Sequence, residues 1–188
     1  MRKLAVLTFL SLDGVMQAVR LPEEDTSNGF EHGGWATRYW DEVMVQVKEE
    51  AMSKPYDLLL GRKTYELFAA NAKESDPSPL NDLTKYVVTN TLDRLEWRNS
   101  IPVPGDLVRE VTRLKSQDGP LLQVHGSWQL INTLLVNDLV DELRLWIFPV
   151  VLGGGKRLFQ HCKFLGDLSL LRTGSTANGV IMAIYKCR

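Results

Sequence analysis

The sequence predicts an α/β fold, with a largely parallel central sheet flanked by helices and an antiparallel hairpin at the C-terminal end. Three observations support this class. Short apolar runs typical of buried strands recur along the chain. They alternate with segments whose apolar residues have helical spacing, and such alternation favours a parallel sheet. The tail instead has two strand-like runs around Ala177-Asn178-Gly179, and Asn-Gly between such runs is a strong hairpin signal.

The first half of the chain predicts, in order, a strand, a long loop, a helix, a strand and a helix. These elements cover residues 3–11, 15–34, 40–54, 56–60 and about 61–70. The first strand is apolar on both faces, so we interpret the N-terminal run as a buried strand rather than a signal peptide. A loop as long as residues 15–34 is usually functional or mobile in a compact domain, and we expect it to cover a site.

The second half continues the alternation and then changes to the hairpin. Strands are expected over residues 85–89, 121–125 and 141–150, and the hairpin strands over 167–173 and 180–186. Between them, Val108, Val111 and Leu114 mark the apolar face of one helix, and Trp128, Ile131, Leu134 and Leu135 mark that of another.

Composition and charge exclude several classes of protein. The chain has 188 residues, of which 44% are apolar and 24% charged, so we expect a single domain over residues 1–188. The formal net charge is −1 without a basic cluster, so no nucleic-acid partner is expected. No apolar run approaches the roughly 20 residues that would span a bilayer. Cys162 and Cys187 have neither disulfide nor metal-site spacing, even with His161 adjacent, so a cytoplasmic protein without a metal is expected.

The clearest chemical signal is Gly61-Arg62-Lys63-Thr64, where a buried strand ends at the start of a helix. Free backbone N–H groups and the helix dipole favour an anion at such a place. The two cations add positive charge, and the Thr64 hydroxyl can donate to a phosphate oxygen. The alternative is a surface turn with two solvated cations and a Thr that caps the helix.

Two further strand ends strengthen this interpretation. Gly126-Ser127-Trp128 forms a second strand-to-helix junction, and Thr89-Asn90 ends a third strand. Ligands of open α/β sheets bind outside the carboxyl ends of the strands, so we expect the three ends to meet at one crevice. Each alone is weak, because a tight turn before a helix explains Gly126 and Ser127 equally well.

Two glycine-bearing loops leave their roles open. Gly153-Gly154-Gly155 with Lys156 and Arg157 lacks the P-loop and Rossmann patterns, and it either holds substrate or cofactor or bends the chain toward the hairpin. His32-Gly33-Gly34-Trp35 closes the long loop. It forms either a ring-stacking wall or lid, or a hinge whose Trp packs into the core.

Taken together, these segments resemble the dihydrofolate-reductase-like family, and more narrowly the reductase domain of riboflavin biosynthesis and its stand-alone relatives. The segments that carry the resemblance are Ser11-Leu12-Asp13-Gly14, Gly61 to Glu66, Val88-Thr89-Asn90, Gly126-Ser127, Leu139 to Leu143 and Gly153 to Phe159. They occur in the family's order over nearly the whole chain. The resemblance implies a three-layer α/β fold that binds NADPH.

The resemblance also implies roles for the cofactor-binding residues. Arg62 would face the ribose 2′-phosphate, while Lys63 and Thr64 would serve the pyrophosphate. Thr89 and Asn90 would lie beside the adenosine, Gly126, Ser127, Trp128 and Gln129 beneath the pyrophosphate, and Leu12 and Gly14 beside the nicotinamide. The folate enzymes carry two or three glycines where this chain has Gly126 alone, so Ser127 would donate in place of a second glycine N–H.

The substrate side is less determined. The folate enzymes place a proton-donating carboxylate on the first helix, and Asp41 is the candidate here, although an acid favoured by the helix dipole explains it equally well. Riboflavin-type reductases need no such carboxylate. Trp35, Gly154 and Gly155 are candidate substrate-binding residues.

The resulting hypothesis is an NADPH-dependent reductase that transfers a hydride to a small heterocycle, either pterin-like or ribosylaminopyrimidine-like. The alternatives are a non-catalytic nucleotide-binding or regulatory module and, third, a protein that holds a flavin. Deaminase signatures are absent from the sequence. A homodimer is expected from the apolar strand 143–148 and the closing hairpin, although burial inside the sheet explains that strand equally well.

Overall fold

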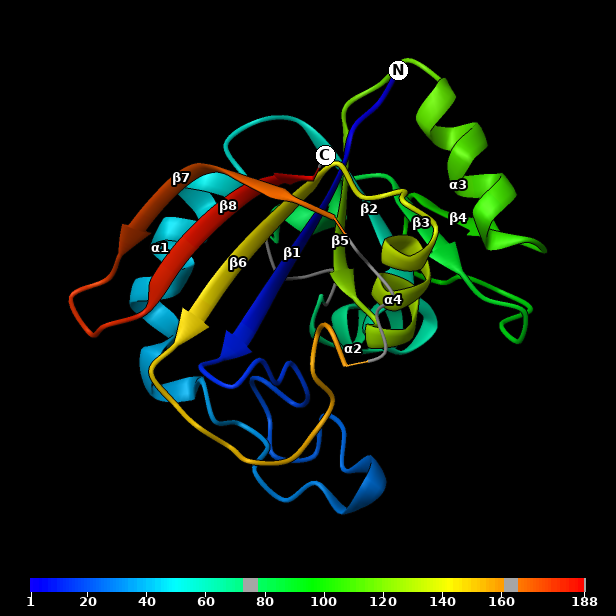
Figure 1. The fold of residues 1–188 in the computed structure, drawn as a ribbon. Coiled ribbons are helices and arrows are strands. Elements are labelled where there is room, and N and C mark those ends of the chain that lie inside the picture. Colours follow the sequence, from blue (N-terminus) through cyan, green and yellow to red (C-terminus); the bar gives the residue numbers. More distant parts are fainter. Residues whose placement is uncertain (73–77, 161–165, 188) are drawn as a thin grey trace. The chain divides into compact units, whose positions relative to one another are not determined.

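The computed structural model describes residues 1–72, 78–160 and 166–187 (Figure 1). The chain divides into two compact units, each made of two stretches. Unit 1 comprises Met1–Val6 and Pro55–Val140, and unit 2 comprises Leu7–Lys54 and Asp141–Arg188. Strand β1 (Leu4–Ser11) contributes its first residues to unit 1 and the rest to unit 2. A single domain over residues 1–188 therefore stays a prediction, and His161 and Cys162 lie outside the described residues.

Unit 1 contains a parallel sheet in the order β4-β3-β2-β5-β1. Its other strands are β2 (Tyr56–Gly61), β3 (Lys85–Val88), β4 (Ser100–Val103) and β5 (Leu121–Gly126). Its helices are α2 (Arg62–Asn71), α3 (Leu107–Ser116) and α4 (Trp128–Val136), with a 3-10 turn, η3 (Pro79–Asn81).

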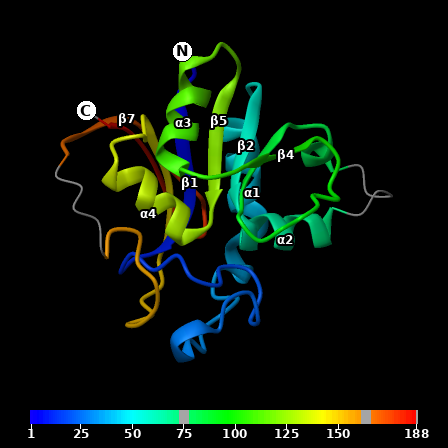
Figure 2. The same ribbon diagram turned by 90° about the vertical axis from the view of Figure 1, so that its right-hand side faces the viewer.

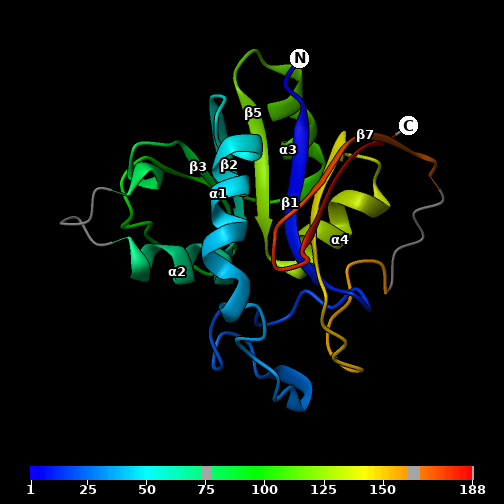
Figure 3. The same ribbon diagram turned by 90° about the vertical axis from the view of Figure 1, so that its left-hand side faces the viewer.

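The helices of unit 1 cover both faces of its sheet. The connection from β2 through α2 to β3 crosses the sheet in one direction, and that from β4 through α3 to β5 crosses it in the other. Because such crossovers are right-handed, the two helices lie on opposite faces. Figures 2 and 3 show α3 and α4 on one side of the unit 1 sheet and α2 on the other. Accordingly Leu58, Leu59 and Leu60 are all fully buried, although successive side chains point to opposite faces.

A buried lysine lies at the start of β3. Lys85 is fully buried, and its ammonium donates to the carbonyl oxygens of Asn81 (3.0 Å), Leu83 (2.8 Å) and Arg98 (3.0 Å). The same nitrogen lies 4.3 Å from the ring centroid of Trp97. Burial, followed by the positive charge of Arg98, lowers the pKa of Lys85 to about 8. One side chain thus joins the segment before β3 to the segment before β4.

Unit 2 contains the strands β1, β6, β8 and β7 in that order, with β6–β8 and β8–β7 antiparallel. The last three are β6 (Glu142–Phe148), β7 (Leu168–Ser175) and β8 (Ile181–Cys187). Helix α1 (Trp40–Ala51) follows two 3-10 turns, η1 (Ser27–Gly29) and η2 (Thr37–Tyr39). Its apolar face, with Val43, Val47 and Ala51, forms one core with Trp146 and Phe148 of β6.

The structure confirms the predicted α/β class, the largely parallel sheet and the closing hairpin. It adds β4, which the sequence analysis missed. The hairpin closes through residues 176–180, where the Thr176 N–H donates to the Val180 carbonyl oxygen at 2.9 Å. In β6, Leu143, Trp146 and Phe148 are fully buried. This agrees with the alternative explanation of the apolar strand 143–148, which is burial inside the sheet rather than contact with a second copy.

Within the described ranges, no helix is both long and apolar enough to cross a membrane. Over the same residues, no group of three or more His, Cys, Asp or Glu side chains is arranged to hold a metal ion.

Candidate functional site

Two strand-to-helix junctions lie side by side in unit 1. Strand β2 ends at Gly61, and α2 begins at the next residue, while β5 ends at Gly126 and α4 begins after Ser127. The parallel pairing sets Leu60 of β2 opposite Gly126 of β5. Both junctions therefore occur at the carboxyl edge of neighbouring strands, which is where ligands bind to open α/β sheets.

In each junction, a glycine leaves the space that a hydroxyl group of the other junction occupies. A Cβ atom on Gly61 would lie 2.4 Å from Ser127 Oγ, and one on Gly126 would lie 2.7 Å from Thr64 Oγ1. Contacts this short do not occur, so neither position accommodates a side chain without movement of its neighbour. Gly126 also has φ of +152°, a conformation that L side chains rarely adopt, and the peptide bond to Ser127 is cis. The two turns thus interlock through Thr64 and Ser127.

Neither α2 nor α4 has a side-chain cap at its N-terminus, and neither has an acidic residue in its first turn. The alternative that Thr64 caps α2 is wrong, because Gly61 occupies the N-cap position and no side chain of the described chain accepts a capping hydrogen bond there. First-turn amides without a cap attract an anion.

The cations of the first junction lie in this first turn. Arg62 Nη1 is 3.2 Å from Glu66 Oε1 one turn further along α2, and both side chains are 44% exposed. Lys63 is also exposed. Positive side chains at a helix N-terminus oppose the helix dipole, so they weaken the isolated helix and suit it to a bound anion.

The other candidate residues of unit 1 lie along the same edge or in α4. Gly61 pairs with Val88, so Thr89 and Asn90 follow β3 beside the first junction. Thr89 Oγ1 accepts from the amides of Thr91 (3.2 Å) and Leu92 (3.1 Å), while Asn90 is exposed. Trp128 is half-buried and Gln129 exposed in the first turn of α4.

In unit 2, a carboxylate organises the loop after β1. Asp13 accepts hydrogen bonds from Ser11 Oγ (2.7 Å) and from the amides of Leu152 (3.1 Å) and Gly153 (2.9 Å). Partial burial raises its pKa, but these hydrogen bonds outweigh burial and lower the pKa of Asp13 to about 2. Arg157 Nη2 also lies 3.2 Å from Asp13 Oδ2.

Leu12 and Gly14 flank this carboxylate. The Leu12 amide donates to the Val150 carbonyl oxygen at 2.7 Å, and its side chain is 63% exposed. Gly14 has φ of +83° with open space where a Cβ would point. Hydrogen bonds thus hold the loop after β1 against the loop after β6, and the Leu12 side chain is exposed to solvent.

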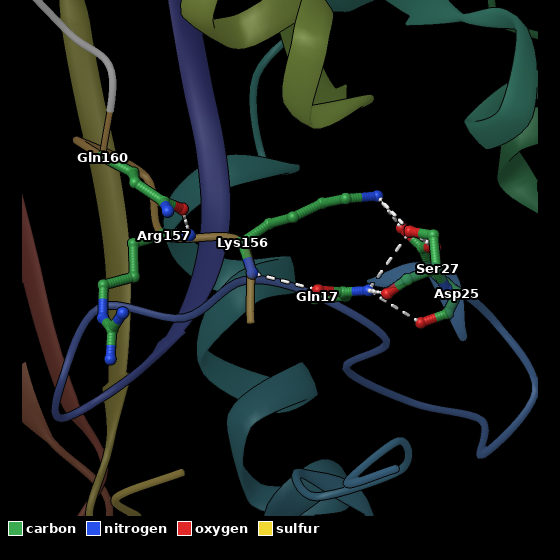
Figure 4. A network of polar contacts seen from close by, with 6 residues as sticks. All are labelled: Gln17, Asp25, Ser27, Lys156, Arg157 and Gln160. Atoms are coloured by element: carbon green, nitrogen blue, oxygen red, sulfur yellow. Dashed lines mark hydrogen bonds and ion pairs between the residues drawn. The ribbon is translucent and has the colours of Figure 1, made fainter. Parts of the chain in front are cut away.

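A second polar network fixes the long loop of unit 2 (Figure 4). Gln17 is 3% exposed, and its amide nitrogen donates to the carbonyl oxygens of Asp25 and Ser27, both at 3.0 Å. Its side-chain oxygen accepts from the Lys156 amide at 3.0 Å. The Lys156 ammonium reaches Asp25 Oδ2 at 2.5 Å and Ser27 Oγ at 2.7 Å.

The two candidate glycines of the second loop differ. A Cβ on Gly155, which has φ of +112°, would lie 2.8 Å from both Phe30 and Val15. Gly154 has open space around it and is exposed. Gly155 is therefore a packing position against the long loop, whereas Gly154 leaves room for another molecule.

Trp35 and Asp41 were the remaining candidates. The Trp35 ring lies 5.3 Å from that of Phe148 in an edge arrangement, and its indole N–H donates to the Gln17 carbonyl oxygen at 2.9 Å. Trp35 thus packs against the core of unit 2, as the hinge alternative required. Asp41 is exposed in the first turn of α1.

The sequence analysis did not assign roles to Asp13, Gln17, Asp25 or Lys156 in holding these loops. Asp13 and Lys156 lie in two of the segments that carry the family resemblance, but nothing in the sequence linked either residue to its partner. In unit 1, by contrast, the structure brings together Gly61, Thr64, Gly126 and Ser127.

Sequence comparison identifies relatives over most of the chain. The profile of the RibD C-terminal domain family matches residues 2–182. The protein YyaP of Bacillus subtilis (strain 168) is 33% identical over 136 residues, which are 68% of this chain and 72% of YyaP. YwjB of the same strain is 32% identical over 105 residues, or 55% of this chain and 58% of YwjB.

Solved structures share the fold at low identity. A putative riboflavin biosynthesis protein from Shewanella sp. PV-4 has a TM-score of 0.70 and 21% identity, with 99% of each chain covered. Dihydrofolate reductase from Enterococcus faecalis, complexed with NADP(H) and RAB-propyl, has a TM-score of 0.65 and 15% identity over 99% of this chain and 96% of that one. A pyrimidine reductase-like protein from Corynebacterium diphtheriae has a TM-score of 0.59 and 14% identity, over 100% and 92% of the two chains.

These likenesses confirm the dihydrofolate-reductase-like, reductase-type fold. Because the family profile extends over almost the entire sequence, the chain belongs to the RibD C-terminal domain family.

Proposed function

We propose that this protein is an NADPH-dependent reductase that transfers a hydride to a small heterocyclic substrate, pterin-like or ribosylaminopyrimidine-like. The observation that supports it best is the pair of interlocked junctions in unit 1, where two uncapped helix N-termini meet at one sheet edge. Amides arranged in this way suit a pyrophosphate, since its oxygens accept several N–H donors at once. The NADP(H) bound by the Enterococcus faecalis enzyme of the same fold adds support.

Within this proposal, each residue of unit 1 has a distinct role. The amides of α2 and α4, with the hydroxyls of Thr64 and Ser127, bind the pyrophosphate. Arg62 leaves Glu66 to pair with the ribose 2′-phosphate, an exchange that is easy because their ion pair is half-exposed. Lys63 adds charge, Thr89 and Asn90 border the adenosine, and Trp128 and Gln129 support the turn of α4.

The nicotinamide would supply the hydride, and the chain would bind, orient and exclude water. Leu12 and Gly14 are the proposed neighbours of the nicotinamide. Trp35, Gly154 and Gly155 are the proposed substrate side, with Trp35 and Gly155 acting through the packing of the loop. Asp41, which is exposed in the first turn of α1, is the proposed proton donor.

Titration calorimetry with NADPH and NADH tests the binding step. Wild-type protein should bind NADPH, and Arg62→Ala should weaken NADPH about 10- to 100-fold while changing NADH little, because a charge-assisted contact to phosphate contributes about 1.5–3 kcal/mol. Arg109→Ala is the matched control, since Arg109 lies in the first turn of the capped helix α3. Equal NADPH affinity in wild type and Arg62→Ala contradicts the proposed role of Arg62.

Turnover separates the reductase from a non-catalytic nucleotide-binding or regulatory module. NADPH oxidation is followed at 25 °C with panels of pterins, pyrimidines and quinones. Consumption of NADPH that depends on one of these compounds supports the reductase. Tight NADPH binding without turnover on any panel member would instead identify a module, and a yellow purified protein would point to a flavin.

We also propose a cytoplasmic homodimer. Leu170 and Leu171 on the edge strand β7 are each 55% exposed, and Ile181 of the neighbouring strand is 46% exposed. Exposed apolar residues on an edge strand favour association with a second copy. Light scattering on the purified chain measures the mass directly. A Leu171→Glu variant should shift it from dimer to monomer, and a monomeric wild type would contradict the dimer.

A further inference from the structure

The ammonium group of Lys85 occupies a cage of acceptors in unit 1. Its three N–H donors match three backbone carbonyl oxygens, those of Asn81, Leu83 and Arg98, at 2.8–3.0 Å. The indole ring of Trp97 forms one further side of the cage, with its centroid 4.3 Å from the same nitrogen. Carbonyl dipoles and the face of an aromatic ring both attract positive charge, so the cage suits a cation better than a neutral group.

Stability alone does not explain a charge at this position. Lys85 is fully buried, and burial lowers the pKa of its ammonium to about 8, because the charge loses its water. An apolar side chain of the same length would avoid this loss. The three donors are satisfied only when all three carbonyl groups point toward the ammonium, so Lys85 selects one arrangement of the segments that carry them.

Trp97 connects this cage to helix α2. Its indole N–H donates to Asn81 Oδ1 at 2.8 Å, which holds the ring beside the cage. Its backbone N–H donates to the Tyr65 hydroxyl oxygen at 2.9 Å, and the two rings lie 6.0 Å apart. Both residues are buried. A displacement of Trp97 is therefore passed on to Tyr65, since close-packed side chains transmit movement to their neighbours.

Tyr65 anchors the first turn of α2. Among the residues of α2, all of which the structure describes, Tyr65 alone is buried. It directly follows Lys63 and Thr64, which are proposed to bind the pyrophosphate of the cofactor. The helix has no side-chain cap at its N-terminus, so the position of this turn depends on the packing of Tyr65 and on the close approach of Thr64 to Gly126.

We propose that Lys85 is a positioning residue of the cofactor site: its ammonium holds Trp97, and Trp97 holds the first turn of α2 through Tyr65. The inference rests on the proposed function, because it concerns the turn that would bind the cofactor. Lys85 pairs with Leu58 of β2, three residues before Gly61, so it lies at the opposite end of the strands from the proposed cofactor residues. It acts on the cofactor without touching it.

Calorimetry with NADPH measures the effect on the cofactor. Lys85→Met keeps the length of the side chain and removes its charge, and it should weaken NADPH binding about 10-fold, since a displaced turn loses a charge-assisted contact. Lys115→Met is the matched control and should bind as wild type does. Lys115 also donates to a backbone carbonyl oxygen, that of Leu139 at 2.7 Å, but from α3 on the other face of the sheet. Equal affinities of the two variants overturn the inference.

A double-mutant cycle tests the route through Tyr65. Tyr65→Phe removes the hydroxyl oxygen that accepts from the Trp97 amide, and it should weaken NADPH binding about 5-fold. If Lys85 acts through this contact, the double variant should bind little more weakly than Lys85→Met, whereas independent effects would multiply to about 50-fold. Multiplied effects, or an unchanged affinity in Tyr65→Phe, contradict the route. If Lys85→Met does not fold, as judged by circular dichroism, the affinity of Tyr65→Phe decides.

Nuclear magnetic resonance of the chain without cofactor separates this inference from the proposed function. The amide signals of Lys63 and Thr64 should move in Lys85→Met and stay in place in Lys115→Met, because Lys85 contacts Trp97 and Trp97 bonds to Tyr65. Unmoved signals in Lys85→Met refute the link. Absence of NADPH binding in the wild type counts against the proposed function and leaves this result unaffected.

Lys85→Ala tests whether the cage recognises charge. The substitution removes the ammonium but none of the carbonyl groups or the indole, so hydrogen exchange of the Trp97 amide should become faster. Added propylammonium, which replaces the missing part of the side chain, should slow the exchange again, because the cage attracts a cation. Propanol at the same concentration, the neutral control, should not. Equal slowing by both compounds, or by neither, shows that the charge of Lys85 does not hold Trp97 and overturns the inference.

Discussion

Helices α2 and α4 begin differently from α3, although all three follow strands of the same unit. Asp106 caps α3, accepting a hydrogen bond from the Arg109 amide at 3.1 Å, and Glu110 adds negative charge in the first turn. Helices α2 and α4 have glycine and serine at their N-cap positions and no acid in the first turn. The chain thus uses a carboxylate of its own where a helix is structural and omits it where an anion is proposed to bind.

The same contrast extends to loops. In unit 2, Asp13 satisfies the amides of Leu152 and Gly153 in the way that Asp106 satisfies the start of α3. Amides that the chain pairs with its own carboxylate are held in place without a ligand. Uncapped amides leave part of the stability of their segment to be supplied by whatever binds there.

The largest expected effect that tests this contrast is that of Gly126→Ala. The new Cβ would lie 2.7 Å from Thr64 Oγ1 at φ of +152°, so we expect a loss of about 3 kcal/mol in the free energy of unfolding together with weaker NADPH binding. Urea denaturation and calorimetry measure the two. Gly105→Ala is the matched control, because Gly105 also has positive φ but its nearest neighbour would be 3.9 Å away, which limits the loss to about 1 kcal/mol.

Gly61→Ala isolates the steric part of the same interlock. Gly61 has φ of −74°, so alanine brings no backbone strain, and the expected loss of about 2 kcal/mol comes from the contact with Ser127. Ser127→Gly in the same chain should restore part of the stability, measured as a coupling energy in a double-mutant cycle. Strict additivity of the two substitutions would show that the junctions do not interlock.

Acid should remove the contribution of Asp13. Its pKa is about 2 in the folded protein, below that of an unfolded chain, so its stabilisation is complete above pH ~4 and is lost as the pH falls through about 2. We expect the difference in unfolding free energy between wild type and Asp13→Asn, on the order of 1 kcal/mol at pH 5, to shrink toward pH 2. A difference that stays constant over this range would contradict the assignment.

The smallest effect is expected for Asp106→Ala. Loss of the cap of α3 should lower the free energy of unfolding by about 1 kcal/mol without changing NADPH affinity. Thr64→Val should do the reverse, lowering affinity with little loss of stability, since Thr64 caps no helix. If both variants change affinity equally, the distinction between capped and uncapped helices has no functional meaning.

Local patterns predicted the junctions well. Gly61 and Gly126 are the last residues of buried strands and precede amphipathic helices, so a few neighbouring residues determine both turns. Strand β4 was missed because it has only four residues, one of them Pro102, and no alternation long enough to recognise.

Contacts between distant parts of the sequence could not be predicted in this way. Asp13 meets Leu152 and Gly153, which are about 140 residues away in the chain. Lys156 follows three glycines in the sequence, and only the fold of unit 2 shows that its ammonium pairs with Asp25. The periodicity of apolar residues indicates which face of an element is buried, but it does not indicate which charged side chains pair in the folded protein.

The buried ammonium of Lys85 provides a way to measure local opening of unit 1. Amine-reactive reagents modify exposed lysines within minutes, but Lys85 is fully enclosed by Asn81, Leu83, Arg98 and Trp97. Acylation of this lysine therefore requires the segments around β3 to separate first. The rate at which mass spectrometry detects the label on Lys85 therefore measures how fast these segments separate. The measurement works in a mixture and needs no spectroscopic probe.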